Sequence, residues 1–189
     1  MISGNDLHFI SYYCTMYRLW FVLLLLVLGS AGCFREPSFP EEPSIGFEKI
    51  EYKAGTKDSI LVRISFQDGD GDLGLNPNEL SPPFDQAGPH YFNYLADLYY
   101  EKSPGQFEKY IFPSGLPTFY GRFPRLTPQS SDPDKPRPLE GVLIYGYEVS
   151  IGLKAVLGNT RIKFILKIKD RALHESNIIE TEPILIPSL

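Results

Sequence analysis

Apolar and polar residues alternate along most of the chain after residue 44, which is the pattern of β-strands that bury one face. The clearest segments are SILVRISF (59–66), YFNYLADLYYEK (91–102) and TRIKFILKIKD (160–170), and weaker ones cover 45–53, 106–112, 139–151 and 180–186. No segment has a convincing helical period. About seven strands predict an all-β fold, an antiparallel sandwich of immunoglobulin or fibronectin type over residues 45–189, with a small open barrel as the alternative.

Two connections are too long for the short loops of a sandwich. They cover residues 74–90 and 113–138, and the second contains seven prolines. Long loops without secondary structure are uncommon unless they are functional or mobile. Within the second, TPQSSDPDKPRP is expected to be mobile, and LPTFYGRF, with three aromatic residues, is expected to be packed down or to face a ligand.

The N-terminal segment has the features of an export signal. Ten strongly apolar residues run from Leu19 to Leu28, too few to span a bilayer comfortably, and small residues follow them. The sequence GSAGC then resembles the lipobox of bacterial lipoproteins. The resemblance implies that residues 1–32 are a removed signal peptide, a helix in the precursor, and that Cys33 carries lipid and anchors the chain to the membrane. An uncleaved membrane anchor is the alternative, and Met16, just before Arg18, is the expected true start.

Residues 33–44 are rich in proline and glutamate and predict an extended tether between the lipid and the domain. Phe34 follows the lipidated cysteine instead of the Asp associated with inner-membrane retention in enteric bacteria, which favours the outer membrane. Cys33 is the only cysteine after residue 32, so no internal disulfide is expected. The net charge of −5, without a dense basic run, argues against nucleic-acid binding.

The segment DGDGDLGLNPNE (68–79) carries the most specific candidate chemistry. Its oxygen-bearing residues follow the spacing of a calcium-binding loop, with the backbone carbonyl of Gly74 as a further ligand. The candidate side-chain ligands in this segment are Asp68, Asp70, Asp72, Asn76 and Glu79. The sixth position departs from the pattern, because Leu73 stands where the sharp turn needs glycine. A solvated polar turn and pairing with a basic side chain are the alternatives to calcium.

A second polar segment, DRALHESN (170–177), follows the best strand in the chain. In the immunoglobulin arrangement, the loop after the second strand lies beside the loop after the sixth. Asp170 and Asn177 would then complete an oxygen cage around the aspartates. Alternatively, Arg171 would replace the ion by donating to a carboxylate.

Together, ISFQDGDGDLG and IKDRALHESNIIET resemble a family of envelope lipoproteins of Bacteroidota, with an F-x-D-G-D-G-D-L-G element and a later D-R-A-x-x-x-S-N element. The resemblance covers most of residues 33–186. It implies a single exported β domain, and it implies no activity.

The residues favour binding over catalysis. After residue 32 the chain has only His90 and His174 as histidines and no nucleophile motif, so no enzyme is predicted. Aromatic residues crowd the segment 91–123, and the candidates for an exposed platform for an envelope glycan or protein are Tyr91, Tyr99, Tyr110, Tyr120 and Phe123. The alternative is that these rings seal the hydrophobic layer beneath the Pro-rich loop. The sequence thus predicts a non-catalytic binding or accessory module. A structural envelope component and a carbohydrate-active enzyme are the alternatives.

Overall fold

The computed structural model describes residues 38–113, 115, 119–126 and 137–188, together with Arg18 and Trp20, which are helical. The predicted signal peptide, the lipidation site Cys33 and the first part of the tether otherwise lie outside the described residues. The chain divides into two compact units, Met1–Glu36 and Pro37–Leu189, and the second holds the fold. Among the described residues, no helix has the length and apolar character needed to cross a membrane.

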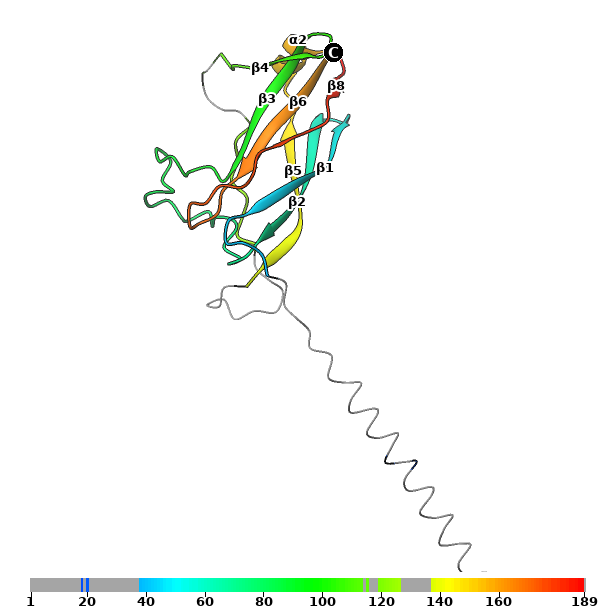
Figure 1. Ribbon diagram of the computed structural model, residues 1–189. Helices are drawn as coiled ribbons and strands as arrows, with labels where there is room; N and C mark the ends of the chain where they lie inside the picture. The colour runs from blue at the N-terminus through cyan, green and yellow to red at the C-terminus, as the bar shows by residue number, and fades with distance from the viewer. Residues whose placement is uncertain are drawn as a thin grey trace, which may run out of the picture. The chain divides into compact units, whose positions relative to one another are not determined.

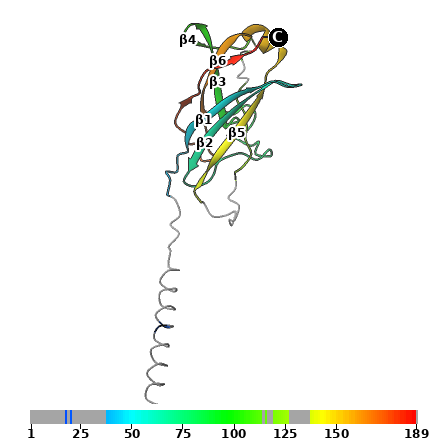
Figure 2. The same cartoon turned by 90° about the vertical axis from the view of Figure 1, so that its right-hand side faces the viewer.

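The strands form two antiparallel sheets (Figure 1). One sheet contains β1 (Ser44–Lys53), β2 (Ser59–Asp68) and β5 (Leu139–Glu148), with β2 in the middle, as Figure 2 shows. The other has the order β4 (Gln106–Lys109), β3 (Tyr94–Ser103), β6 (Thr160–Ile168) and β7 (Ile179–Glu180), and β8 (Ile184–Ile186) also pairs with β6. The all-β sandwich is confirmed. Its strand order agrees with an immunoglobulin-type arrangement, although that finer kinship stays a prediction.

The core lies between the two sheets, where the predicted alternation places apolar side chains. Every second residue of β2 from Ile60 to Phe66 is buried, and so is every second residue of β6 from Ile162 to Ile168. Tyr147 and Phe164 stack across this space with ring centroids 5.2 Å apart. Aromatic packing of this kind stabilises a core beyond its area burial.

Two parts of the strand prediction are wrong. The chain does contain a short helix, α2 (Ile151–Leu157), which the Ser150 side chain caps by accepting a hydrogen bond from the Leu153 N–H at 3.1 Å. Seven residues are too few to show a helical period. The single strand predicted over 180–186 is divided into β7 and β8, because the Thr181 hydroxyl takes over the bond from the Phe164 N–H and Pro183 has no N–H to donate.

The inner face of each sheet ends in an aspartate at the same end of the sandwich, which we call the acidic pole. Strand β2 continues two residues beyond the predicted end, so its alternation carries Asp68 inward after Phe66. In the same way, Asp170 follows Ile168 of β6 with the inward parity. Asp68 is fully buried and Asp170 is 2% exposed. The fold therefore places two carboxyl groups at one end of its apolar core.

The loop after β2 needs its glycines because other segments pack closely against it. Gly71 and Gly74 have positive φ angles of 71° and 92°. A Cβ atom on Gly71 would collide with the carbonyl oxygen of Arg137, and one on Gly74 with that of Pro124. Glycine is the only residue that combines this backbone conformation with such a close approach.

We predict that Gly74→Ala destabilises the fold more than Gly105→Ala. Gly105 has a similar φ of 76°, but no atom lies within 4 Å of the place that a Cβ would take, so alanine there costs only the left-handed conformation, about 1–2 kcal/mol. At Gly74 the overlap with Pro124 should cost about 1–3 kcal/mol more. Urea unfolding measures both values, and equal losses would contradict the close packing of the loop.

Candidate metal centre

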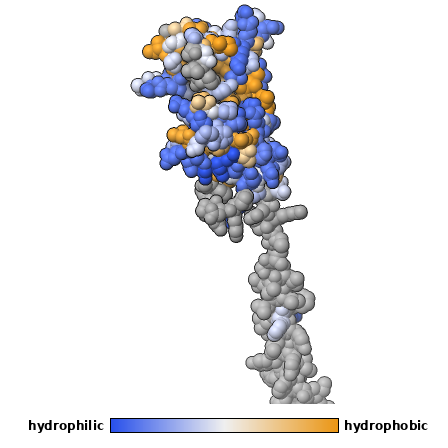
Figure 3. All heavy atoms as spheres, turned by 90° about the vertical axis from the view of Figure 1, so that its left-hand side faces the viewer, coloured by the Kyte–Doolittle hydropathy of each residue, from blue (hydrophilic) through white to orange (hydrophobic). Residues whose placement is uncertain are grey.

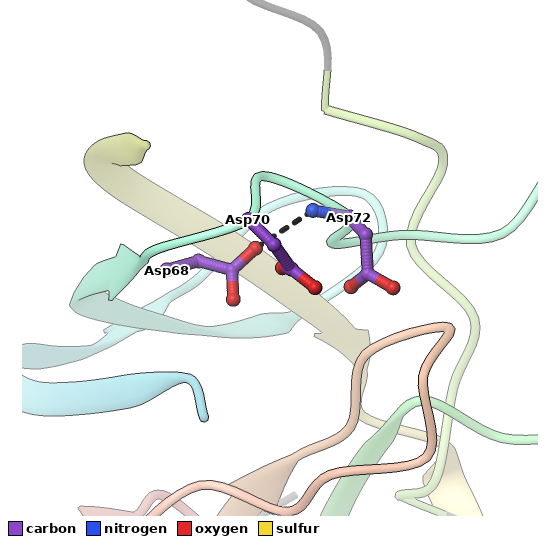
Figure 4. Close-up of side chains that lie close together, drawn as sticks. All are labelled: Asp68, Asp70 and Asp72. Atoms are coloured by element: carbon purple, nitrogen blue, oxygen red, sulfur yellow. Dashed lines mark hydrogen bonds between the residues drawn. The ribbon is translucent and has the colours of Figure 1, made fainter. Parts of the chain in front are cut away.

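Three carboxylates from one segment converge at the end of β2. Asp68, Asp70 and Asp72 each offer one oxygen, and these oxygens lie within 4.8 Å of one another. Figure 4 shows the three side chains next to each other on the loop. Oxygens this close together can contact one cation at the same time. Carboxylate oxygens are hard ligands of the kind that Ca²⁺ and Mg²⁺ prefer, and Ca²⁺ tolerates the more flexible geometry.

Two oxygens of this cluster are buried and have no hydrogen-bond partner. Asp68 Oδ2 accepts from the Asp72 N–H at 2.8 Å, but Asp68 Oδ1 and Asp70 Oδ1 accept nothing. They are two of the five buried side-chain atoms without a partner in the described part of the chain. Leaving a buried polar atom unsatisfied costs about 1–3 kcal/mol, and more when the group is charged. A cation would satisfy both oxygens at once.

The loop after β6 lies beside this cluster, as the sequence predicted. Leu73 and Asp170 form an isolated antiparallel bridge, and the Arg171 N–H donates to Asp72 Oδ1 at 3.2 Å. The Arg171 guanidinium donates to the Gly74 carbonyl oxygen, at 3.5 Å. Among the described residues Arg171 makes no ion pair, so its direct contact with the carboxylates is made by its backbone N–H, and its guanidinium charge acts on Asp72 only from a distance.

Asp170 and Asn177 have other partners than the cluster. Asp170 Oδ1 accepts from the His174 N–H at 2.7 Å, and Oδ2 lies 2.9 Å from His174 Nδ1. The Asn177 side chain instead ties down the start of β1, since it accepts from the Ile45 N–H at 2.8 Å and donates to the Ile45 carbonyl at 2.9 Å. The expected cage from this loop is thus corrected: Asp170 is adjacent but paired, and Asn177 anchors a strand.

Asn76 and Glu79 are also placed differently from the calcium-loop spacing. The Glu79 carboxylate forms an ion pair with Arg125, and Asn76 is exposed with its backbone N–H bound to Glu79. The reason is that the chain turns away after Asp72: Leu75 donates from its N–H to the Phe123 carbonyl oxygen at 3.0 Å. The segment therefore stops resembling a calcium loop at its sixth position, where Leu73 enters the core instead of a turn glycine.

Arg122 is a structural residue that the sequence analysis missed. Its Nη1 donates to the carbonyl oxygens of Tyr91 at 2.7 Å and Phe84 at 3.3 Å. Its Nη2 donates to the carbonyl oxygens of Asn76 at 3.2 Å and Glu79 at 3.1 Å. The guanidinium carbon also lies 4.8 Å from the centre of the Tyr91 ring. The planar guanidinium of Arg122 thus holds several parts of the long connection between β2 and β3 together.

The predicted aromatic platform is only partly present. Phe123 is 3% exposed and belongs to the core, because it follows the inward turn of its segment, so its place in the platform is corrected. Tyr91 and Tyr99 are half-buried. Tyr110 and Tyr120 share one pocket of about 250 Å³ with Asp97 and Lys109. Lys109 pairs with Asp97 at 2.7 Å, and the Tyr120 hydroxyl donates to Asp97 at 3.1 Å.

Exposed apolar side chains occur at the other end of the domain. Ile111 and Val156 line a groove between β4 and α2. Figure 3 shows hydrophobic residues gathered at the upper end of the face that it displays, while hydrophilic residues dominate the lower end. On this face the two ends of the domain thus differ in hydropathy.

The acidic pole disfavours its own ionisation. Burial, followed by the charges of Asp70 and Asp72, raises the pKa of Asp68 to about 7. Burial and neighbouring carboxylates also raise the pKa of Asp72 and of Asp170. The hydrogen bond to Asp170 raises the pKa of His174. A bound cation would reverse the first effect, because an opposite charge stabilises the ionised carboxylate.

Comparison with known proteins returned no match for this chain among family models, curated proteins or solved structures. The function must therefore be argued from the geometry of the pole and its surroundings.

We predict that, without a divalent cation, folding stability falls as the pH rises from about 5 to about 8. Asp68 titrates near pH 7 in the folded state and near 3.8 ordinarily, so its protonated form contributes stability at low pH that is lost as the pH passes 7. His174 acts in the same direction, since its raised pKa means that its charged form stabilises the fold below that pKa. Urea unfolding of chelator-treated protein at several pH values measures the slope.

Asp68→Asn should weaken this dependence and make the ion-free protein more stable than the parent at about pH 8. The amide keeps an oxygen that accepts from the Asp72 N–H, but it carries no charge. Glu182→Gln is the matched control, because Glu182 is exposed and should leave the slope unchanged. A stability that rises over the same pH range would show that the carboxylates do not repel as described.

Proposed function

We propose that this protein is an exported, lipid-anchored binding or accessory module of the bacterial envelope, without catalytic activity and stabilised by calcium. The observation that carries the proposal is the carboxylate cluster, in which Asp68 is fully buried and its Oδ1 has no partner. The lipid anchor at Cys33 and the outer-membrane location are supported by the sequence GSAGC alone.

Calcium accounts for the cluster better than the two alternatives. A solvated turn does not describe Asp68, which has no contact with water at 0% exposure. A basic partner does not describe it either, because the guanidinium of Arg171 donates to a backbone carbonyl. Three carboxylates at this spacing supply the hard oxygen ligands that Ca²⁺ prefers, and the remaining ligands would be waters or backbone carbonyls.

The local geometry also supports a role other than catalysis. Asp170, His174 and Ser176 are the residues that a catalytic triad would need here. The Ser176 hydroxyl, however, donates to the Asn177 carbonyl oxygen at 2.8 Å and accepts from the Ile168 N–H at 3.0 Å, so its bonds go to the backbone and not to a general base. A glycoside hydrolase needs two carboxyl groups that face each other across an open cleft. Asp68 is closed off in the core, which disfavours that use of the cluster.

A partner of the envelope, such as a glycan, is favoured by the pocket beside β3. Tyr110 and Tyr120 line it, and its charged groups are Asp97 and Lys109, which pair with each other. Rings and a few fixed polar groups are the usual lining of small-ligand sites. A volume of about 250 Å³ suits one sugar ring better than an extended chain.

We predict that calcium raises the melting temperature of the chelator-treated protein. At a concentration of about 100 times Kd, binding should add about 2.7 kcal/mol to the free energy of unfolding. Asp70→Ala should remove the effect, whereas Glu182→Gln should keep it, and magnesium should act more weakly because it prefers shorter bonds to oxygen. Identical melting curves with and without calcium would refute the proposal.

The anchor is tested separately with the full precursor expressed in a bacterial host. Wild-type protein should partition with the membrane fraction and incorporate labelled fatty acid, because the lipidated cysteine inserts into the bilayer. Cys33→Ser should abolish the label. Labelling that persists in this variant, or wild-type protein that stays unlabelled, would exclude lipidation at Cys33.

A further inference from the structure

The connection between β2 and β3 is held to the rest of the domain by a few contacts. Residues 76–91 contain short turns of their own, in which Phe84 donates to Ser81 and Gly88 donates to Asp85. Most of their links to the rest of the domain run through Arg122, which binds four of their carbonyl groups, and through the ion pair between Arg125 and Glu79. A weaker one comes from Lys169, whose Nζ lies 3.5 Å from the Pro89 carbonyl oxygen. The loop is therefore held mainly from the segment 122–125.

That segment is in turn paired with the residues that follow Asp72. The Leu75 N–H donates to the Phe123 carbonyl oxygen and the Leu126 N–H donates to the Leu73 carbonyl oxygen, both at 3.0 Å. Leu73 and Leu75 are buried, and Gly74 lies against the backbone of Pro124. This short ladder begins at the residue directly after the last carboxylate of the cluster. The position of Asp72 and the position of Arg122 are thus mechanically linked.

We infer that a cation bound by Asp68, Asp70 and Asp72 determines whether residues 76–91 are held in one conformation. The effect is transmitted by the ladder between Leu73–Leu75 and Phe123–Leu126. The inference rests on the proposed calcium site. Without the ion, the carboxylates repel one another, and the segment relieves this repulsion by moving apart and straining the ladder next to it. With the ion, the ladder is fixed and Arg122 presents the loop in one conformation.

The consequence is a surface that depends on calcium. Residues 76–91 carry four prolines and the exposed side chain of Leu80, which is 54% accessible. A loop held in one conformation loses less entropy on binding a partner than a mobile one. A local change of charge at the pole would in this way decide whether the loop is ready to bind.

Hydrogen exchange measured by mass spectrometry tests this on the full mature chain in detergent. Calcium should slow the exchange of the hydrogen-bonded amides of Phe84, Gly88 and Tyr91 by at least about threefold relative to chelator. The amide of Gly69, which bonds to the Pro40 carbonyl oxygen at 2.8 Å beside the cluster, should slow as well. The turn between β3 and β4, residues 103–106, should not change.

Two arginine variants distinguish the hydrogen bonds from Arg122 to the loop, here called the clamp, from the ion site. Arg122→Gln should keep the calcium-induced rise in melting temperature, but its loop amides should exchange quickly with and without calcium. Arg63→Gln is the matched control, because Arg63 is an exposed arginine of β2 outside the loop and the ladder, and the loop of that variant should still respond to calcium. Loop exchange in Arg122→Gln that still responds like the wild type would overturn the role of the ladder and clamp.

The remaining outcomes distinguish this inference from the proposal on which it rests. If calcium raises the melting temperature of the wild type but leaves the exchange of residues 76–91 unchanged, the inference is wrong and the calcium site stands. If isothermal titration finds no calcium binding and the melting temperature does not move, both are wrong.

Discussion

Burial of negative charge at one end of the sandwich is the constraint on which the rest of the structure depends. The alternation that builds the two inner faces does not stop at the last apolar residue of β2 or β6, so Asp68 and Asp170 both point into the protein. The two aspartates are compensated differently. Asp170 accepts from the backbone and the ring of His174, whereas Asp68 accepts from one backbone N–H and its other oxygen has no partner. An ion would satisfy that oxygen. The unpaired oxygen of Asp68 therefore supports the proposed ion site more strongly than the acidic composition of the loop does.

The same pole is where distant parts of the chain meet. The Gly69 N–H bonds to Pro40 just before β1, Gly71 touches Arg137 just before β5, and Asp72 accepts from Arg171 after β6. Each approach uses the backbone or a side chain of the DGDGDLG segment, and the glycines leave room for it. The motif therefore has two physical roles: its aspartates gather charge, and its glycines allow neighbouring segments to pack. A change at one aspartate reaches several segments for this reason.

The sequence was sufficient to predict the sandwich, which follows from period-two alternation. The meeting of the two loops followed from the immunoglobulin arrangement, in which the loops after the second and sixth strands lie side by side. The sequence also contained the burial of Asp68, because extending the strand by two residues gives that position the inward parity. The prediction for the outer half of the calcium loop, Asn76 and Glu79, was wrong. The sequence feature that indicated this was Leu73, an apolar residue at the position that needs a turn glycine. Nothing local to LPTFYGRF marks Arg122 as a clamp, because its four partners are backbone carbonyls from a segment at least 31 residues away. Side-chain bonds to carbonyl groups leave no pattern of residue types in the partner segment.

The acidic pole also links the two sheets, which no disulfide joins in this domain. Antibody domains join their two sheets through a buried disulfide, and a chain with Cys33 as its single cysteine after residue 32 has no such bond. Here the end of β2 is joined to the segment after β6 by the Leu73–Asp170 bridge and by the bond from Arg171 to Asp72. A cation among the aspartates would strengthen that junction by neutralising the loop that forms one side of it. Because ion binding depends on the concentration of the free ion, such a link would adjust how firmly the two sheets are joined without altering the core between them.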